Sequence, residues 1–460
     1  MNLIRKRIFY YAICCAWLLS VPQVSYAQLS EMESLKALVE NMHQTLQKAL
    51  SRIDQLEKEK AANSGKIERL EQEVANRAEQ ETASVPPAQT AQPVVQTSLG
   101  ALNPAISVIG NFVGRVDNRK IVNSDGNRID SRFNLREAEI DMRAPVDPYA
   151  DAVLIASLES EGGGKFSAGV EEGYVNIKKL PFLDEPPLGL KLKVGRFRPA
   201  FGMFNILHTH DLPTTFRSLL TEEFMGADGF IQDGVSGNFF IPTPWDQESS
   251  LDATMEVLTG GDLAIAPETK SRTSYLGHLR WFRTFEDAHN VSLGWSSYVR
   301  PAGNGVGSAD FHGVDFLYRW KPIRQGEWKS FLFGGEAMFA RRAYPGAAEP
   351  SDVERAITLR NLSPHSGKPF GVSLFGQWQF GQRTYGGVRG DYTTTLFDPG
   401  LTRRSVTPYL SYYLSEFLRA RVSYEHRWSD LFTENNRNTF LFELNWIFGA
   451  HPPEPFWVNK

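Results

Sequence analysis

The sequence predicts an all-β protein: a transmembrane antiparallel β-barrel of about 16 strands, preceded by an α-helical coiled coil. Three observations predict it: the order of segments along the chain, the repeated alternation of apolar and polar residues over residues 105–449, and the character of the last predicted strand. Successive side chains of a strand point to opposite faces. One face of this last strand is therefore apolar and the other polar, which fits a strand between lipid and water: Phe440, Phe442, Leu444, Trp446 and Phe448 against Thr439, Glu443 and Asn445.

Residues 1–27 have the pattern of a cleavable export signal. Arg5, Lys6 and Arg7 precede an apolar stretch that is too short to span a membrane, and Ser25-Tyr26-Ala27 supplies the small residues of a cleavage site. A membrane anchor is the alternative interpretation. Both cysteines of the chain lie inside this segment, so disulfides and thiolate zinc sites are excluded from the mature protein.

Residues 28–80 are predicted to form a periplasmic coiled coil. Apolar residues recur at a spacing of 3 and 4 from Met32 to Val74, with polar interruptions at Lys60 and Asn63. An amphipathic helix on a membrane surface is the alternative. A single helix cannot bury such a seam, so we expect self-association, with a homotrimer preferred over a dimer. Residues 81–104 are rich in Pro and Gln and are predicted to be an extended linker.

Alternation within residues 105–449 assigns an inward and an outward face to each predicted strand. In the segment from Leu418 to Trp428, for example, Arg419, Arg421, Glu425 and Arg427 are expected to face inward. A soluble β-sandwich also alternates, but it would rarely extend over a single domain of this length. The net charge of −4 argues against a nucleic-acid partner. We therefore expect membrane lipid to surround the barrel.

Two segments resemble the phosphate-selective porin O/P family. They are Glu172 to Pro181, and Leu190 to Gly202, where Gly195, Arg196, Phe197, Arg198, Phe201 and Gly202 match a family pattern of the form Val-Gly-Gln/Arg-Phe-Lys/Arg-x-Pro-Phe-Gly. The stretch from Arg217 to Gly237 resembles the loop that comes next in that family. The resemblance implies a trimeric 16-stranded barrel whose long loops narrow the pore. It implies a channel for small hydrophilic solutes, with anions such as phosphate preferred.

The balance of inward charges and the C-terminal end of the chain both differ from the family pattern. The inward positions carry basic and acidic residues in near balance, so they do not by themselves indicate an anion: Arg143, Lys191, Lys193, Arg280, Arg319, Lys321, Arg389, Arg419, Arg421 and Arg427 against Glu137, Glu139, Asp141, Asp151, Glu159, Asp252, Glu256, Asp315, Glu336, Asp391 and Glu425. Residues 450–460 form a Pro-containing tail, where Phe456 and Trp457 are expected to pack on the barrel rim.

The candidate pore-lining and solute-binding residues are Arg196, Arg198, Arg217, Arg419, Arg421, Arg427 and Glu425. Replacing Arg419 and Arg421 by glutamine is expected to move the reversal potential toward cations without changing the stability of the trimer. The polar segment from Met203 to Pro244 either folds into the pore on aromatic anchors or is an ordinary extracellular loop. The run His208-Thr-His-Asp211 is expected to be a polar loop, with no metal or cofactor bound.

These features predict a porin of the bacterial outer membrane with its coiled coil in the periplasm. The alternative is a structural tether that links the outer membrane to peptidoglycan through the coiled coil. No catalytic arrangement is visible in the sequence, so an enzyme is not expected.

Overall fold

The computed structural model divides the chain into two units, Met1–Val95 and Gln96–Lys460. It describes residue 47 and residues 104–458 except 120, 123–127, 130–132, 163, 181–184, 245, 247, 262, 265–271, 303–307, 343–367, 397–398, 432–433 and 451–454. The predicted signal peptide, coiled coil and nearly all of the linker lie outside the described residues. The second unit holds almost all of the residues that are described.

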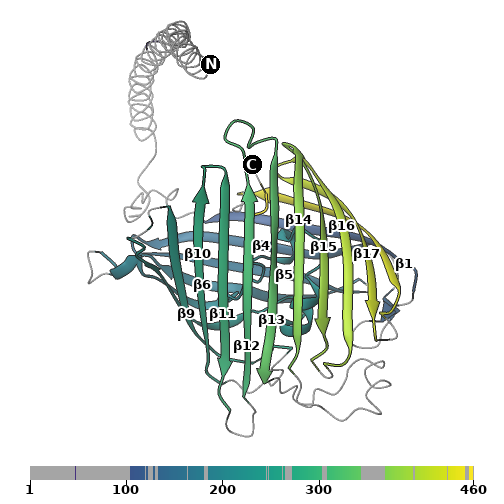
Figure 1. Ribbon diagram of the computed structural model, residues 1–460, viewed down its shortest axis with the longest axis horizontal. Coiled ribbons are helices and arrows are strands. Elements are labelled where there is room, and N and C mark those ends of the chain that lie inside the picture. The colour runs from purple at the N-terminus through teal and green to yellow at the C-terminus, as the bar shows by residue number, and fades with distance from the viewer. Residues whose placement is uncertain are drawn as a thin grey trace, which may run out of the picture. The chain divides into compact units, whose positions relative to one another are not determined.

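The second unit is a closed barrel of 16 antiparallel strands, as the sequence predicts. Each barrel strand pairs with the next one along the chain, and β1 pairs with β18 to close the barrel (Figure 1). The strands are β1 (Ala105–Asp117), β4 (Phe133–Asp147), β5 (Ala150–Gly162), β6 (Lys165–Ile177), β7 (Lys191–Phe197), β8 (Gln232–Ile241), β9 (Ser249–Leu258), β10 (Ser274–Phe285), β11 (His289–Arg300), β12 (Ala309–Trp320), β13 (Ser330–Arg342), β14 (Phe370–Gly381), β15 (Thr384–Thr394), β16 (Thr402–Ser415), β17 (Leu418–Ser429) and β18 (Arg437–Gly449).

Shorter elements lie in the connections. Strands β2 (Ile121–Val122) and β3 (Arg128–Ile129) pair with each other between β1 and β4. The helices are η2 (Pro187–Gly189), η3 (Thr209–Asp211) and α3 (Leu219–Met225). No helix in the described part of the chain has the length and apolar character needed to cross a membrane.

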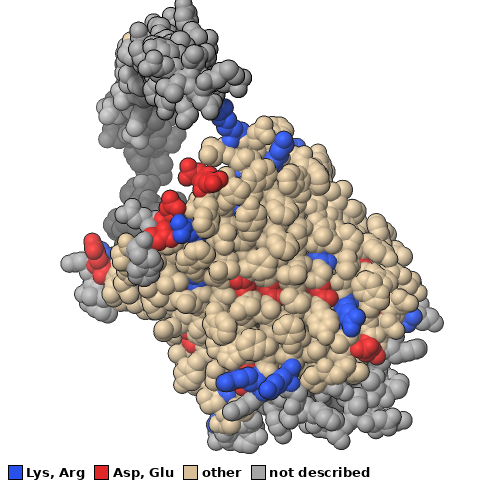
Figure 2. All heavy atoms as spheres, viewed as in Figure 1, with Lys and Arg blue, Asp and Glu red and all other residues tan. Residues whose placement is uncertain are grey.

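The two faces of the wall agree with the predicted alternation. On β17, Val422, Tyr424 and Trp428 are about 40% exposed, whereas Arg421 and Glu425 are buried. Uncharged side chains cover most of the barrel wall on the side shown in Figure 2. A continuous apolar outer face is stable against lipid, whereas the charged groups require the water or hydrogen-bond partners found inside.

Four connections at one end of the barrel are tight turns. Two or three residues join β4 to β5, β10 to β11, β14 to β15 and β16 to β17. In the β10–β11 turn, Glu286 and Asp287 both have positive φ, 49° and 55°. Two consecutive residues of positive φ form the tight turn whose twist matches the flanking strands. At the other end, residues 198–231 connect β7 to β8, and this connection creates the candidate site.

Candidate pore constriction

The β7–β8 connection, which we call the pore loop (residues 198–231), folds into the lumen. It joins neighbouring strands, yet it contacts inward side chains of distant ones. Gly202 N–H donates to Ser296 Oγ on β11 at 2.9 Å, and Met203 N–H donates to Glu336 Oε1 on β13 at 2.6 Å. The predicted limit at Pro244 is wrong, because residues 232–241 pair with β7 and β9 as strand β8. Backbone polar groups at membrane depth need such pairing.

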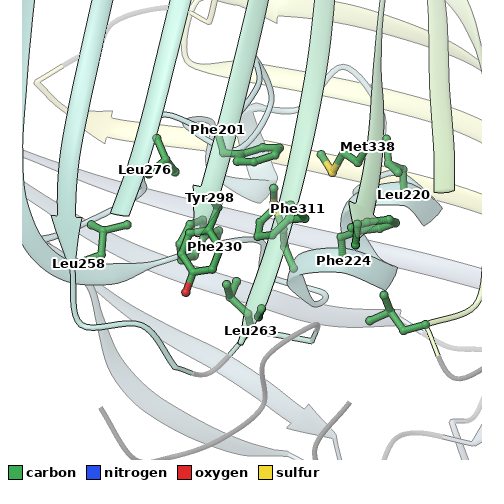
Figure 3. Packing of buried hydrophobic residues seen from close by; sticks show 14 of the residues in the cluster. Phe201, Leu220, Phe224, Phe230, Leu258, Leu263, Leu276, Tyr298, Phe311 and Met338 are labelled. Atoms are coloured by element: carbon green, nitrogen blue, oxygen red, sulfur yellow. The ribbon is translucent and has the colours of Figure 1, made fainter. Parts of the chain in front are cut away.

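Aromatic side chains anchor one side of the pore loop. The ring of Phe201 lies 4.5 Å from that of Phe311 on β12, and the ring of Phe230 lies 5.5 Å from that of Tyr298 on β11. Phe224, on helix α3 within the loop, packs into the same buried cluster (Figure 3). Each fully buried aromatic side chain contributes roughly 1.5–3 kcal/mol of transfer free energy. The loop is therefore held by a small hydrophobic core inside the barrel.

Two arginines of β17 hold the loop at another part of the wall. Arg419 Nη2 donates to the carbonyl of His210 at 2.6 Å, and Arg421 Nη2 donates to the carbonyl of Leu212 at 2.7 Å. Both guanidiniums also bind Glu443 of β18, at 3.0 and 2.9 Å. Glu443 is fully buried. These charges are therefore occupied in positioning the loop rather than exposed to water.

Helix α3 is attached to the wall through its acidic residues. Ser218 Oγ accepts a hydrogen bond from Thr221 N–H and so caps the helix. Arg403 on β16 pairs with Glu222 at 3.1 Å and with Glu223 at 2.8 Å. Burial raises the pKa of Glu222, but Arg403 and Arg427 outweigh it and hold that pKa below its usual range. The carboxylates of Glu222 and Glu223 thereby hold the helix against the buried guanidinium of Arg403.

The two histidines of the loop meet glutamates of β4 and β6. His208 Nδ1 lies 3.1 Å from Glu139 Oε1, and His208 Nε2 lies 2.7 Å from Glu172 Oε1. His210 Nδ1 lies 3.3 Å from the same oxygen of Glu139. Burial lowers the pKa of both imidazoles, but the charge of Glu139 outweighs it and raises both well above the usual value. Glu139 thus binds both histidines of the loop to the wall.

The C-terminal tail enters the lumen beneath the pore loop. Trp457 is fully buried, and its indole N–H donates to the carbonyl of Asp211. The side-chain amide of Gln377 on β14 donates to the carbonyl of Trp457 at 2.9 Å. The expected packing of this tail on the rim is wrong for Trp457. Gly449, the last residue of β18, has a φ of 100°, which glycine adopts easily and which lets the chain leave the wall there.

A cavity of about 450 Å³, lined by apolar and charged side chains, remains between the loop and strands β8 to β12. Its acidic and basic lining residues are Asp252 on β9, Arg280 on β10, and Asp315 and Arg319 on β12, and His278 of β10 also lines it. Asp252 and Arg280 pair at 2.9 Å. Arg319 forms no ion pair with any residue that the structure describes. In this cavity, charged side chains from the wall meet open space.

The seven candidate residues lie in three different places. Arg198 and Arg217 belong to the pore loop, where Arg198 pairs with Glu171 at 2.6 Å and Arg217 donates to the carbonyl of Leu207 at 2.7 Å. Arg419, Arg421, Arg427 and Glu425 are buried on β17 in ion pairs. Arg196 alternates with the inward Phe197 and pairs with the exposed Asp233 on the outer face.

Sequence reasoning did not select the residues that line the cavity. Alternation does place Asp252, Arg280, Asp315 and Arg319 inward. No pattern in the neighbouring sequence separates these cavity-lining residues from the inward charged residues that bind the pore loop. The position of the loop decides which residues do which.

The chain is similar in sequence to one uncharacterized protein and in structure to several outer-membrane proteins. An uncharacterized protein of Aquifex aeolicus (strain VF5) is 26% identical over 70% of each chain. The outer membrane channel DcaP of Acinetobacter baumannii is 10% identical, with a TM-score of 0.47 over 76% of this chain and 98% of that one. The anion-selective porin from Comamonas acidovorans is 10% identical, with a TM-score of 0.46 over 75% and 99%. No family model matches the sequence.

Proposed function

We propose that the chain is an outer-membrane porin, a water-filled channel for the passive diffusion of small hydrophilic solutes. The cavity beside the pore loop, into which charged wall residues project, carries this proposal. A barrel of 16 strands is too wide for its wall side chains to fill, so its lumen holds water unless other segments occupy it. Here the pore loop and the tail occupy part of the lumen, and the charged cavity remains.

We further propose that the channel prefers anions, such as phosphate, only slightly. The arginines of β17 are neutralised by Glu443 and Glu425 and offer little charge to a passing solute. Arg280 and Arg319 line the cavity and attract anions, while Asp252 and Asp315 oppose them. Charge at a narrow passage has a large effect on selectivity, because low-dielectric walls focus its field. Arg319 is the residue on which the preference depends most.

Conductance across planar lipid bilayers tests both proposals. The purified chain should give stepwise currents, and Arg319→Gln should move the reversal potential in a salt gradient toward cations. Arg404→Gln is the matched control, because Arg404 lies exposed on the outer face of β16 beside Tyr392. Absence of current steps from folded protein would rule out the channel. Current steps with an unchanged reversal potential in Arg319→Gln would remove the anion preference and leave the channel standing.

The homotrimer and the tether to peptidoglycan rest on residues 28–80, which lie outside the described residues. They remain predictions. Loss of cell-wall association on deletion of residues 28–80, with conductance retained, would support a tether in addition to the channel.

A further inference from the structure

Two glutamates of the wall and one histidine of the pore loop converge at a single point. Glu137 and Glu139 are two residues apart on β4, so both point inward, and His210 lies on η3 of the loop. One carboxylate oxygen of each glutamate and one imidazole nitrogen lie within 4.8 Å of one another. We propose that these three side chains bind a divalent transition-metal cation such as Zn²⁺, with water completing the coordination.

The measured spacings suit such an ion. Ligands held about 2.1 Å from a tetrahedral zinc are about 3.4 Å apart. His210 Nδ1 lies 3.3 Å from Glu139 Oε1 and 3.8 Å from Glu137 Oε2. Two of the three spacings are therefore close to those around a bound ion, and the third, between the two carboxylate oxygens, is at most 4.8 Å.

Two of the three proposed ligands have a buried polar atom without a hydrogen bond. Glu137 Oε2 and His210 Nδ1 are buried and make no hydrogen bond with the described residues. Glu137 is 5% exposed and His210 is 3% exposed. Burial of polar atoms without partners is costly, and a cation between them removes that cost. His208, by contrast, has partners for both ring nitrogens and serves to position the loop.

A further carboxylate lies behind the histidine. Asp211 Oδ1 is 3.6 Å from His210 Nε2, on the side of the ring opposite to Nδ1. Metal-binding histidines commonly direct their second nitrogen at a carboxylate, which orients the ring and increases its basicity. Glu171 and Glu172 add negative charge nearby, and Arg198 offsets only part of it.

The donor set also indicates the class of metal. One imidazole nitrogen with two carboxylate oxygens suits Zn²⁺ and similar first-row cations better than Ca²⁺ or Mg²⁺, which favour oxygen alone. Bound there, the cation links strand β4 to the pore loop. The sequence alone does not indicate this metal site. The pair Glu137 and Glu139 supplies only part of the ligand set, and so does the pair His208 and His210.

Metal content of the full-length chain tests the proposal. The protein is prepared without a histidine tag, folded in detergent, loaded with Zn²⁺ and freed of excess by gel filtration. We expect one zinc per chain in the wild type, none in His210→Asn, and one in His278→Asn, which changes another histidine inside the barrel. Asp211→Asn should weaken zinc affinity about 10- to 100-fold.

A wild type without zinc, or a folded His210→Asn that retains it, overturns the proposal. If His210→Asn does not show the heat-modifiable gel mobility of a folded barrel, Glu137→Gln decides. The Oε2 atom of Glu137 makes no hydrogen bond with described residues, so this substitution breaks none there. Folded Glu137→Gln without zinc supports the site, and folded Glu137→Gln with one zinc per chain refutes it.

Discussion

Replacing Arg421 by glutamine should loosen the pore loop. The guanidinium of Arg421 is fully buried and donates to Glu443 Oε2 at 2.9 Å, to the carbonyl of Leu212 at 2.7 Å and to Ser411 Oγ at 2.9 Å. Removing one member of a buried ion pair costs about 3–5 kcal/mol. Glu443 keeps Arg419 and Asn111 as partners, so we expect a loss of about 3 kcal/mol in the free energy of unfolding.

Part of that loss in free energy acts on the pore loop directly, because the hydrogen bond from Arg421 to the carbonyl of Leu212 is removed. A hydrogen bond from a charged donor contributes about 1.5–3 kcal/mol. Losing about 2 kcal/mol raises the population of a displaced loop about 30-fold, since 1.4 kcal/mol corresponds to a factor of ten. The contacts therefore predict a loss of barrel stability in Arg421→Gln in addition to the change in selectivity that is expected from the sequence.

Two measurements can detect this change. The temperature at which the barrel loses its folded mobility on unboiled gels should fall, and single-channel recordings should show frequent brief current fluctuations. Arg319→Gln is the control, because it removes the same charge from an inward strand position that has no described ion pair. If Arg421→Gln has the melting temperature and the quiet current of the wild type, the assigned role of Arg421 is incorrect.

Three further predictions concern the tail, acid stability and the coiled coil. Trp457→Ala, or deletion of residues 450–460, should increase single-channel conductance because the tail occupies the lumen; equal conductance from a folded barrel would contradict this. Burial raises the pKa of Glu434, but the charges of Arg403 and Arg427 outweigh this effect and hold that pKa well below its usual range. The ion pairs of Glu434 therefore stabilise the folded barrel fully above about pH 4.5 and lose strength as the pH falls further. The stability difference between wild type and Glu434→Gln should accordingly shrink in acid, and a constant difference down to pH 2 would be evidence against it. The peptide 28–80 should be a helical trimer that Leu46→Asp dissociates, and sedimentation of a helical monomer at high micromolar concentration would exclude the stalk.

Much of the barrel was predictable because the period of a strand is two. Alternation alone separates Val422 and Tyr424, which face outward, from Arg421 and Glu425, which face inward. The length of the alternating region then predicts about 16 strands, as observed. The charged interior was predictable for the same reason.

The roles of the inward residues were not predictable from the sequence. His210 and Glu139 are far apart in the chain, as are Arg421 and Leu212, and Trp457 meets Asp211 across most of the barrel sequence. Alternation in the sequence assigns strand side chains to the lumen or to the outer face, because this depends on local backbone geometry. Whether an inward side chain binds the loop or lines the open cavity depends instead on where the loop and the tail pack across the barrel, which local patterns do not encode.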